Sequence, residues 1–100
     1  MTAKIPGYKP LRDVLAQAVE QSAAGKGRER HANENPFTQQ PLLQTTRAVG
    51  VGFPLGQASK KITEASGMIR RGQTGPARDE LLGAIVYLAA AIIYLDEGLK

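Results

Sequence analysis

The stretch that decides the fold is PARDELLGAIVYLAAAIIYLDEG, residues 76–98. Its centre, Leu81–Leu95, runs for 15 residues without a charge. As an α-helix this centre would be about 22 Å long, whereas a bilayer-spanning helix needs about 20 apolar residues. Acidic pairs flank it on both sides, and the sequence has no basic cluster there to fix an orientation in a membrane. We therefore predict a helix that is buried in protein, and we expect no membrane partner.

The ends of this stretch carry helix signals. Pro76 suits the first turn, where its missing N–H costs nothing, and Gly98 suits the position after the last turn. Asp79 and Glu80 lie near the positive end of the helix dipole. The sequence thus predicts one helix over nearly the whole of residues 76–98.

Two apolar stripes run along this predicted helix. The first is Leu81, Ile85, Leu88, Ile92 and Leu95, and the second is Ala84, Tyr87, Ala91 and Tyr94. A helix that is apolar nearly all round must be buried nearly all round, and a chain of 100 residues has few other helices to cover it. We therefore predict a homo-oligomer that assembles through this helix and gives the tyrosine hydroxyls partners. The predicted interface comprises Ile85, Tyr87, Leu88, Ala91, Ile92 and Tyr94.

Length and composition indicate one small domain, residues 1–100. A hydrophobic content of 42% supports a single thin core. The absence of cysteine excludes a disulfide framework, a thiolate nucleophile and a cysteine zinc site. Met1–Lys9 lacks the apolar segment of a signal peptide, so we expect a cytoplasmic protein.

Three further helices are predicted before residue 76. An extended arm, residues 1–9, leads into a helix from Pro10 to about Ala24, and Thr38 caps a short helix that has Pro41 in its first turn and ends near Val49. A long helix follows from Pro54 to about Arg71. The residues expected to face inward are Leu11, Val14, Leu15, Ala18, Val19 and Ser22 in the first helix, Leu42, Leu43, Thr46 and Val49 in the second, and Leu55, Ala58, Ile62, Ala65 and Ile69 in the third.

The fold class that follows is all-α. No alternation of apolar and polar residues persists over five positions, so the sequence predicts no strand. We expect a small helical bundle of three main helices and one short helix.

Positive charge is concentrated in the middle of the chain, whose net charge is +4. Between Arg47 and Arg78 there are six basic residues and one acidic residue, Glu64. Such a region favours an anionic ligand, namely a nucleotide, a nucleic acid or an acidic protein. The alternative is that this charge serves solubility alone.

The segment 25–36 is a predicted basic loop with four candidate ligand-binding residues, Lys26, Arg28, Arg30 and His31. Glycines on both sides of Lys26 free the backbone to approach a phosphate, and arginine offers paired hydrogen bonds to it. The GxxxxGK[ST] order of a P-loop is absent. His31 is the only histidine, so we predict a hydrogen-bond donor to an anion and no metal pair. A solvated connector is the alternative.

A second candidate group, Gln57, Lys60, Lys61 and Glu64, lies on one face of the predicted third helix. We expect it to share in ligand binding. A solvated charged face is again the alternative.

The order KKITEASGMI, short turn, DELLGAIVYLAAAIIYL over residues 55–97 resembles the core hairpin of the MazG-like all-α nucleoside triphosphate pyrophosphohydrolases. The resemblance implies carboxylates that bind magnesium, which holds a triphosphate, and assembly into dimers or tetramers. Glu64 and Glu80 match two of the family's carboxylates, whereas Thr63, Gly67 and Gly83 stand at other motif positions. The resemblance therefore implies nucleotide binding in which most metal ligands are missing.

Three functions remain open. The favoured one is a non-enzymatic homo-oligomer that senses or sequesters a phosphorylated small molecule, a nucleotide or nucleotide-derived signal, with no catalytic residue, metal or cofactor. The second is a pyrophosphohydrolase of the MazG-like kind, for which magnesium would be the cofactor. The third is an interaction protein for nucleic acid or protein. No helix is dense in Arg, Lys and base-reading Asn or Gln, which disfavours DNA binding.

Overall fold

The computed structural model describes residues 5–24 and 35–98. These residues form four α-helices and one short 3₁₀ helix, and no strand is found among them. In chain order the helices are α1 (Lys9–Ala24), η3 (Phe37–Gln39), α2 (Pro41–Val49), α3 (Gly52–Arg70) and α4 (Thr74–Gly98). The prediction of an all-α bundle is confirmed for this part of the chain.

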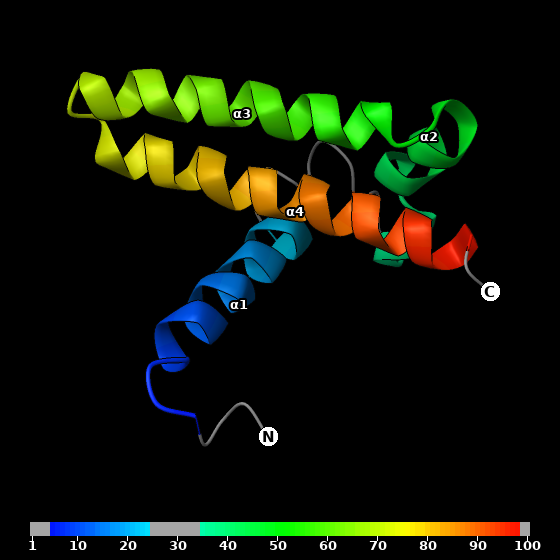
Figure 1. Ribbon diagram of the computed structural model, residues 1–100, viewed down its shortest axis with the longest axis horizontal. Helices are drawn as coiled ribbons and strands as arrows, with labels where there is room; N and C mark the ends of the chain where they lie inside the picture. Colours follow the sequence, from blue (N-terminus) through cyan, green and yellow to red (C-terminus); the bar gives the residue numbers. More distant parts are fainter. Residues whose placement is uncertain (1–4, 25–34, 99–100) are drawn as a thin grey trace.

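The two longest helices, α3 and α4, form an antiparallel hairpin (Figure 1). Gly72 turns the chain with a φ of 76°, a conformation that favours glycine. The amide of Gln73 donates to the carbonyl of Met68 over 2.8 Å and closes the turn. The contact between the helices is made of small side chains, which allow two helix axes to approach closely. Ala58, Ala65, Ala77 and Ala84 are all buried.

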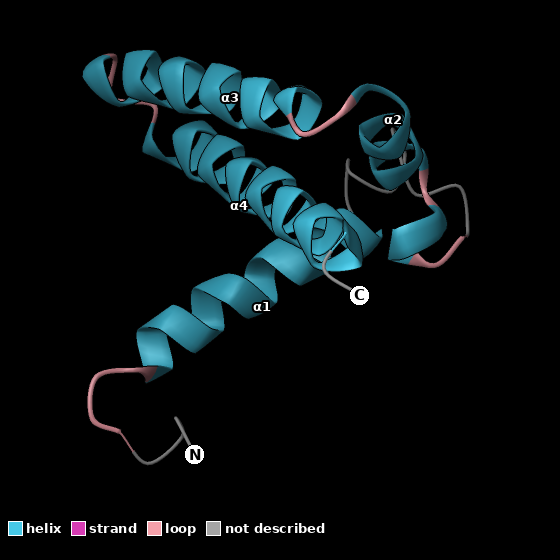
Figure 2. Cartoon of the chain, turned by 45° about the vertical axis from the view of Figure 1, so that its right-hand side comes forward, coloured by secondary structure: helices cyan, strands magenta, loops and turns pink. Residues whose placement is uncertain are grey.

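The remaining helices flank this hairpin on different sides. In both views, α1 meets the middle of α4 with its C-terminal end, on the side away from α3, and its N-terminal end points away from the hairpin (Figures 1 and 2). The side chain of Gln21 donates to the carbonyl of Asp79 over 3.2 Å, and Arg78 donates to Gln17. Since Ala18 is the one buried residue of α1, this helix is held by a small contact.

The core lies where α2 and α3 meet the C-terminal half of α4. Its buried residues are Leu42, Leu43, Ala58, Ala84, Tyr87 and Ala90, and Phe37, Phe53, Val86, Ile93 and Tyr94 pack against them. Arg47 of α2 donates two hydrogen bonds, of 2.9 and 2.7 Å, to Glu97 near the end of α4. That hydrogen bonding raises the pKa of Arg47 above its ordinary value. The core is therefore a three-helix unit that does not include α1.

Helix α2 begins differently from the prediction. Thr38 was expected to cap it, but Thr38 lies in η3 and Gln40 occupies the cap position. Gln40 precedes Pro41, and the residue before a proline is pushed out of the helical region, which explains its φ of −80° and ψ of 160°. The predicted starts of three other helices, Pro10, Pro54 and Pro76, fall one or two residues inside α1, α3 and α4. In these three helices proline therefore lies in the first turn but is not the first residue.

The prediction of inward-facing residues is confirmed for Leu42, Leu43 and Thr46 of α2, but it is wrong for the large side chains of α1 and α3. In α3 the two alanines are buried, whereas Leu55, Ile62 and Ile69 are about half exposed. Val49 of α2 is exposed as well. In α1, Leu11, Leu15 and Val19 are exposed around the buried Ala18. The physical reason is that the helices contact each other through their small residues, and the large residues of the same apolar surface project beside the contact.

Helix α4 shows the same division between its two stripes. Ala84, Tyr87 and Ala91 are buried, and Leu81, Leu88, Ile92 and Leu95 are 40–59% exposed. By length and composition α4 is also able to cross a membrane, although a core helix of a soluble protein meets the same criteria. The stripe of large aliphatic side chains is thus an apolar surface that the described part of the single chain leaves exposed.

Truncating the core of α2 should destabilise the fold. Leu43 is fully buried, so Leu43→Ala is expected to lower the free energy of unfolding by about 3 kcal/mol through lost burial and a residual cavity. Val49→Ala in the same helix is the control, because Val49 is 69% exposed, and it should change stability by less than about 0.5 kcal/mol. Urea unfolding at one fixed protein concentration measures both; equal losses would contradict the described core.

Candidate functional site

The two predicted ligand-binding groups fare differently. Lys26, Arg28, Arg30 and His31 lie outside the described residues. The other four lie on α3, where Gln57 and Lys61 are half-buried and Lys60 and Glu64 are exposed. The structure therefore divides the predicted face into an inner edge toward α4 and an outer edge toward solvent.

Lys61 is the residue of this group that is held in place. Its Nζ lies 3.5 Å from Oε2 of Glu80 and 6.0 Å from the centre of the Tyr87 ring. Its side chain is 18% exposed and that of Glu80 is 25% exposed. A cation over an aromatic face is attracted by the electrons of the ring. Lys61 is thus an ammonium group fixed at the boundary between α3 and α4.

Gly83 makes room for this lysine. A Cβ at position 83 would lie 3.0 Å from Cδ and Cε of Lys61, which is tighter than most Cβ contacts and would make the lysine side chain shift. The lysine stem therefore lies across the bare backbone of α4. In the sequence Gly83 stands out only as a departure from a carboxylate motif, whereas its effect in the structure is steric.

The ring of Tyr87, which lies beside Lys61, packs against a second aromatic ring. The rings of Tyr87 and Phe53 meet edge to face, with centres 6.2 Å apart and planes 85° apart. Phe53 is the second residue of α3 and Tyr87 lies in the middle of α4, so this pair joins the first turn of α3 to the middle of α4. We call Phe53, Lys61, Glu80, Gly83 and Tyr87 the lysine cluster.

The chemistry of the lysine cluster is that of binding. A lysine ammonium has three N–H donors, and a single carboxylate at 3.5 Å leaves donors available to another anion. Lys60, the residue of α3 directly before Lys61, adds a second ammonium group, which is exposed. Gln57, one turn earlier, offers an amide that both donates and accepts.

The carboxylates do not form the magnesium site that the MazG-like resemblance implies. Glu80 pairs with Lys61, and Glu64 is exposed on the outer edge. Among residues 5–24 and 35–98, no three acidic, histidine or cysteine side chains gather closely enough to hold a metal. Magnesium needs several oxygen ligands, so the described residues do not fit this ion.

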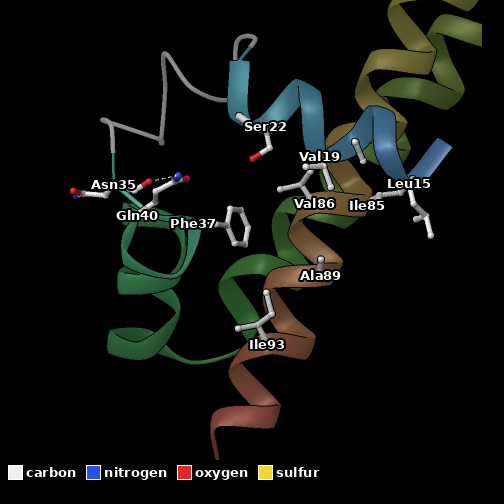
Figure 3. Close-up of a pocket in the computed structure, with 12 residues that line it drawn as sticks. Leu15, Val19, Ser22, Asn35, Phe37, Gln40, Ile85, Val86, Ala89 and Ile93 are labelled. Carbon is white, nitrogen blue, oxygen red and sulfur yellow. Dashed lines mark hydrogen bonds between the residues drawn. The ribbon is translucent and has the colours of Figure 1, made fainter. Parts of the chain in front are cut away.

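An apolar groove was not foreseen from the sequence. It has a volume of about 610 Å³ and lies between α1, η3 and α4. Figure 3 shows Phe37 pointing toward Ala89 and Ile93, with Leu15 and Val19 of α1 on the opposite side. Gln40 donates to the carbonyl of Asn35 over 2.8 Å at one end. The apolar side chains of α1 that line the groove, Leu15 and Val19, could be recognised in the sequence. The steep angle at which α1 crosses α4 could not be predicted from the spacing of its apolar residues.

The residues of the predicted oligomer interface lie on several sides of α4. Leu88 and Ile92 are exposed, and Ile85 and Tyr94 are half-buried, Ile85 on the rim of the groove. Tyr87 and Ala91 are buried inside the single chain. The surface open to another molecule is therefore the stripe of large aliphatic residues.

Comparisons with known proteins give no relative: no protein-family model, curated protein or solved structure matches this chain.

Replacing two helical glycines should separate the role of Gly83 from ordinary helix propensity. Gly56→Ala in α3 adds a methyl group that meets nothing, so it should stabilise the fold by about 0.5–1 kcal/mol. Gly83→Ala should give a clearly smaller gain, because the new methyl group crowds the Lys61 side chain and shifts it from its position between Tyr87 and Glu80. Thermal unfolding compares the two variants. Equal stabilisation would show that Lys61 is not held over Gly83.

Proposed function

We propose that this protein is a non-enzymatic helical module that assembles with copies of itself and binds a phosphorylated small molecule, a nucleotide or nucleotide-derived signal, at the lysine cluster. The observation that carries the ligand proposal is the fixed, part-buried ammonium of Lys61. A cation held in place before the ligand arrives loses little side-chain freedom on binding, so more of the interaction energy appears as affinity. The buried ring of Tyr87 lies beside this charge and helps to hold the ammonium group in place.

Self-association is supported by the distribution of apolar side chains. The single chain leaves large aliphatic residues exposed on α1, α3 and α4, while the buried residues of its core cluster are three alanines, two leucines and Tyr87. Contiguous exposed apolar surface on a soluble chain marks an interaction site. Assembly covers this surface and adds to a core that is small for the length of the chain.

The proposed activity is binding without turnover. The acidic side chains near Lys61 are one paired glutamate and one exposed glutamate, and the described residues hold no carboxylate cluster for magnesium. Hydrolysis of a nucleoside triphosphate to the monophosphate and pyrophosphate, the reaction of the MazG-like enzymes, draws on such a cluster. The same proposal gives Lys60 of α3, and Arg70 and Arg71 at the C-terminal end of this helix, a supporting electrostatic role.

Nucleotide binding is testable with matched lysine variants. Thermal-shift measurements with nucleoside mono-, di- and triphosphates should show stabilisation by one nucleotide class, and Lys61→Met should abolish it. Lys9→Met is the control, since it removes an equal charge from another carboxylate pair, Lys9–Asp13 on α1, and should leave the shift unchanged. A nucleotide at a hundredfold excess over its Kd stabilises the folded state by about 2.7 kcal/mol, which is well above detection.

The same samples distinguish the other functions. Release of pyrophosphate that requires magnesium and disappears in Glu64→Gln would support the pyrophosphohydrolase and overturn the proposal of binding alone. Tight binding of long nucleic acid that weakens steeply with salt would support the interaction protein instead. No shift with any nucleotide would contradict the ligand proposal.

A further inference from the structure

We infer that a second copy of the chain covers the exposed stripe of α4, with its own α4 running antiparallel to the first across a two-fold axis near Leu88. This inference rests on the self-association within the proposed function and specifies which surface meets which. The stripe is Leu81, Ile85, Leu88, Ile92 and Leu95, and we call it the α4 seam.

The spacing of the α4 seam is that of a helix pair. Its members are separated alternately by four and three residues, which is the heptad spacing of two supercoiled helices. Leucine and isoleucine also alternate along it, so leucines occupy one heptad position and isoleucines the other. A helix that only packed inside its own chain would not need this register, and in the chain itself the seam is largely exposed. The heptad spacing therefore indicates that the α4 seam packs against a partner helix, and the described structure supplies no helix at this position.

Helix α3 widens the seam on the same side of the hairpin. Three exposed residues of the seam, Leu81, Leu88 and Leu95, each follow a buried alanine of α4 by four positions. Ile62 and Ile69 follow Ala58 and Ala65 of α3 by the same interval. A step of four residues turns the side-chain direction by about 40° around the helix axis. In two antiparallel helices, equal turns of this kind away from their contact lead to the same side of the pair. The hairpin thus presents a two-helix-wide apolar face, which two copies close into a four-helix bundle.

Charge at the two ends of the seam fixes its direction. Arg78 and Asp96 are both exposed and lie 18 residues apart, which is about five helical turns, so they project from the same side of α4. Their midpoint falls within one residue of Leu88, the centre of the seam. An antiparallel pair places Arg78 of each copy at the level of Asp96 of the other. A parallel pair would place like charges together.

The same charges favour a second copy over a lipid surface. A bilayer would cover the apolar stripe but would give the charges of Asp96 and Arg78 no opposite charge, which is costly where the two groups lose water. The second copy supplies each with its opposite charge. The apolar stripe and its charged ends are then satisfied by one surface, the same surface on another molecule.

Single cysteines test the geometry directly, because the natural chain has none. Under mild oxidation, Leu88→Cys should form a disulfide-linked dimer, since a two-fold axis near this residue brings the two Cβ atoms into bonding range. Leu81→Cys and Leu95→Cys should each remain unlinked alone but cross-link when mixed. Gln44→Cys, exposed on α2, is the control and should remain unlinked. Cross-linking of Leu81→Cys and Leu95→Cys each with itself would overturn the antiparallel arrangement.

Charge reversal is an independent test that needs no cross-link. Arg78→Asp and Asp96→Arg should each weaken dimer formation roughly fivefold, because every dimer contains two such exposed pairs. The double variant should restore it, since the opposite charges face each other again. Additive losses in the double variant would contradict the pairing.

Light scattering and vesicle flotation separate this inference from the proposal beneath it. A wild-type dimer whose Leu88→Cys variant does not cross-link would overturn the α4 seam and leave self-association standing. A wild-type monomer at micromolar concentration would overturn both the seam and self-association. Flotation with phosphatidylcholine–phosphatidylglycerol vesicles would assign the stripe to lipid and likewise overturn the seam. Nucleotide shifts from the lysine variants are read separately from all of these.

Discussion

The close contact between the alanines of α3 and α4 is the constraint on which the rest of the structure depends. Small side chains at the contact allow the two helices to approach each other closely. The large side chains of both helices must then lie on the flanks. One flank receives α2 and becomes the core, and the other remains open. The lysine cluster and the α4 seam are both consequences of this one choice of contact residues.

Helical periodicity predicted the elements well and their inner faces poorly. Proline and glycine signals located every described α-helix to within a few residues, because caps and turns are read from local chemistry. The inward direction is not local. Ala58 and Ile62 belong to one apolar surface by spacing, and only the partner helix determines which of them is covered. The spacing placed both residues on the inner face, whereas the close approach of the two helices covers only the smaller one.

The candidate site shows the same limit. Lys61 was recognisable as one of several cations on a polar face, together with Lys60 and Glu64. That it alone is fixed depends on a missing side chain at Gly83 and a ring at Tyr87, both on another helix. A glycine within an apolar helix was the available signal, since a helix interior pays for glycine in stability unless something needs the space. The apolar groove depended on the crossing angle of α1, for which the sequence has no local signal.

The attachment of α1 has a consequence for how the chain opens. The clasp between Arg47 and Glu97 and the buried residues around Leu43 join α2, α3 and α4 into one cooperative unit, and α1 adds a single buried alanine to it. Local unfolding free energies follow such differences in burial. The amides of α1 therefore exchange with solvent through a low-energy opening that leaves the three-helix unit intact. Each such opening removes one wall of the apolar groove, so the groove is a transient surface whose lifetime is set by a partial unfolding equilibrium.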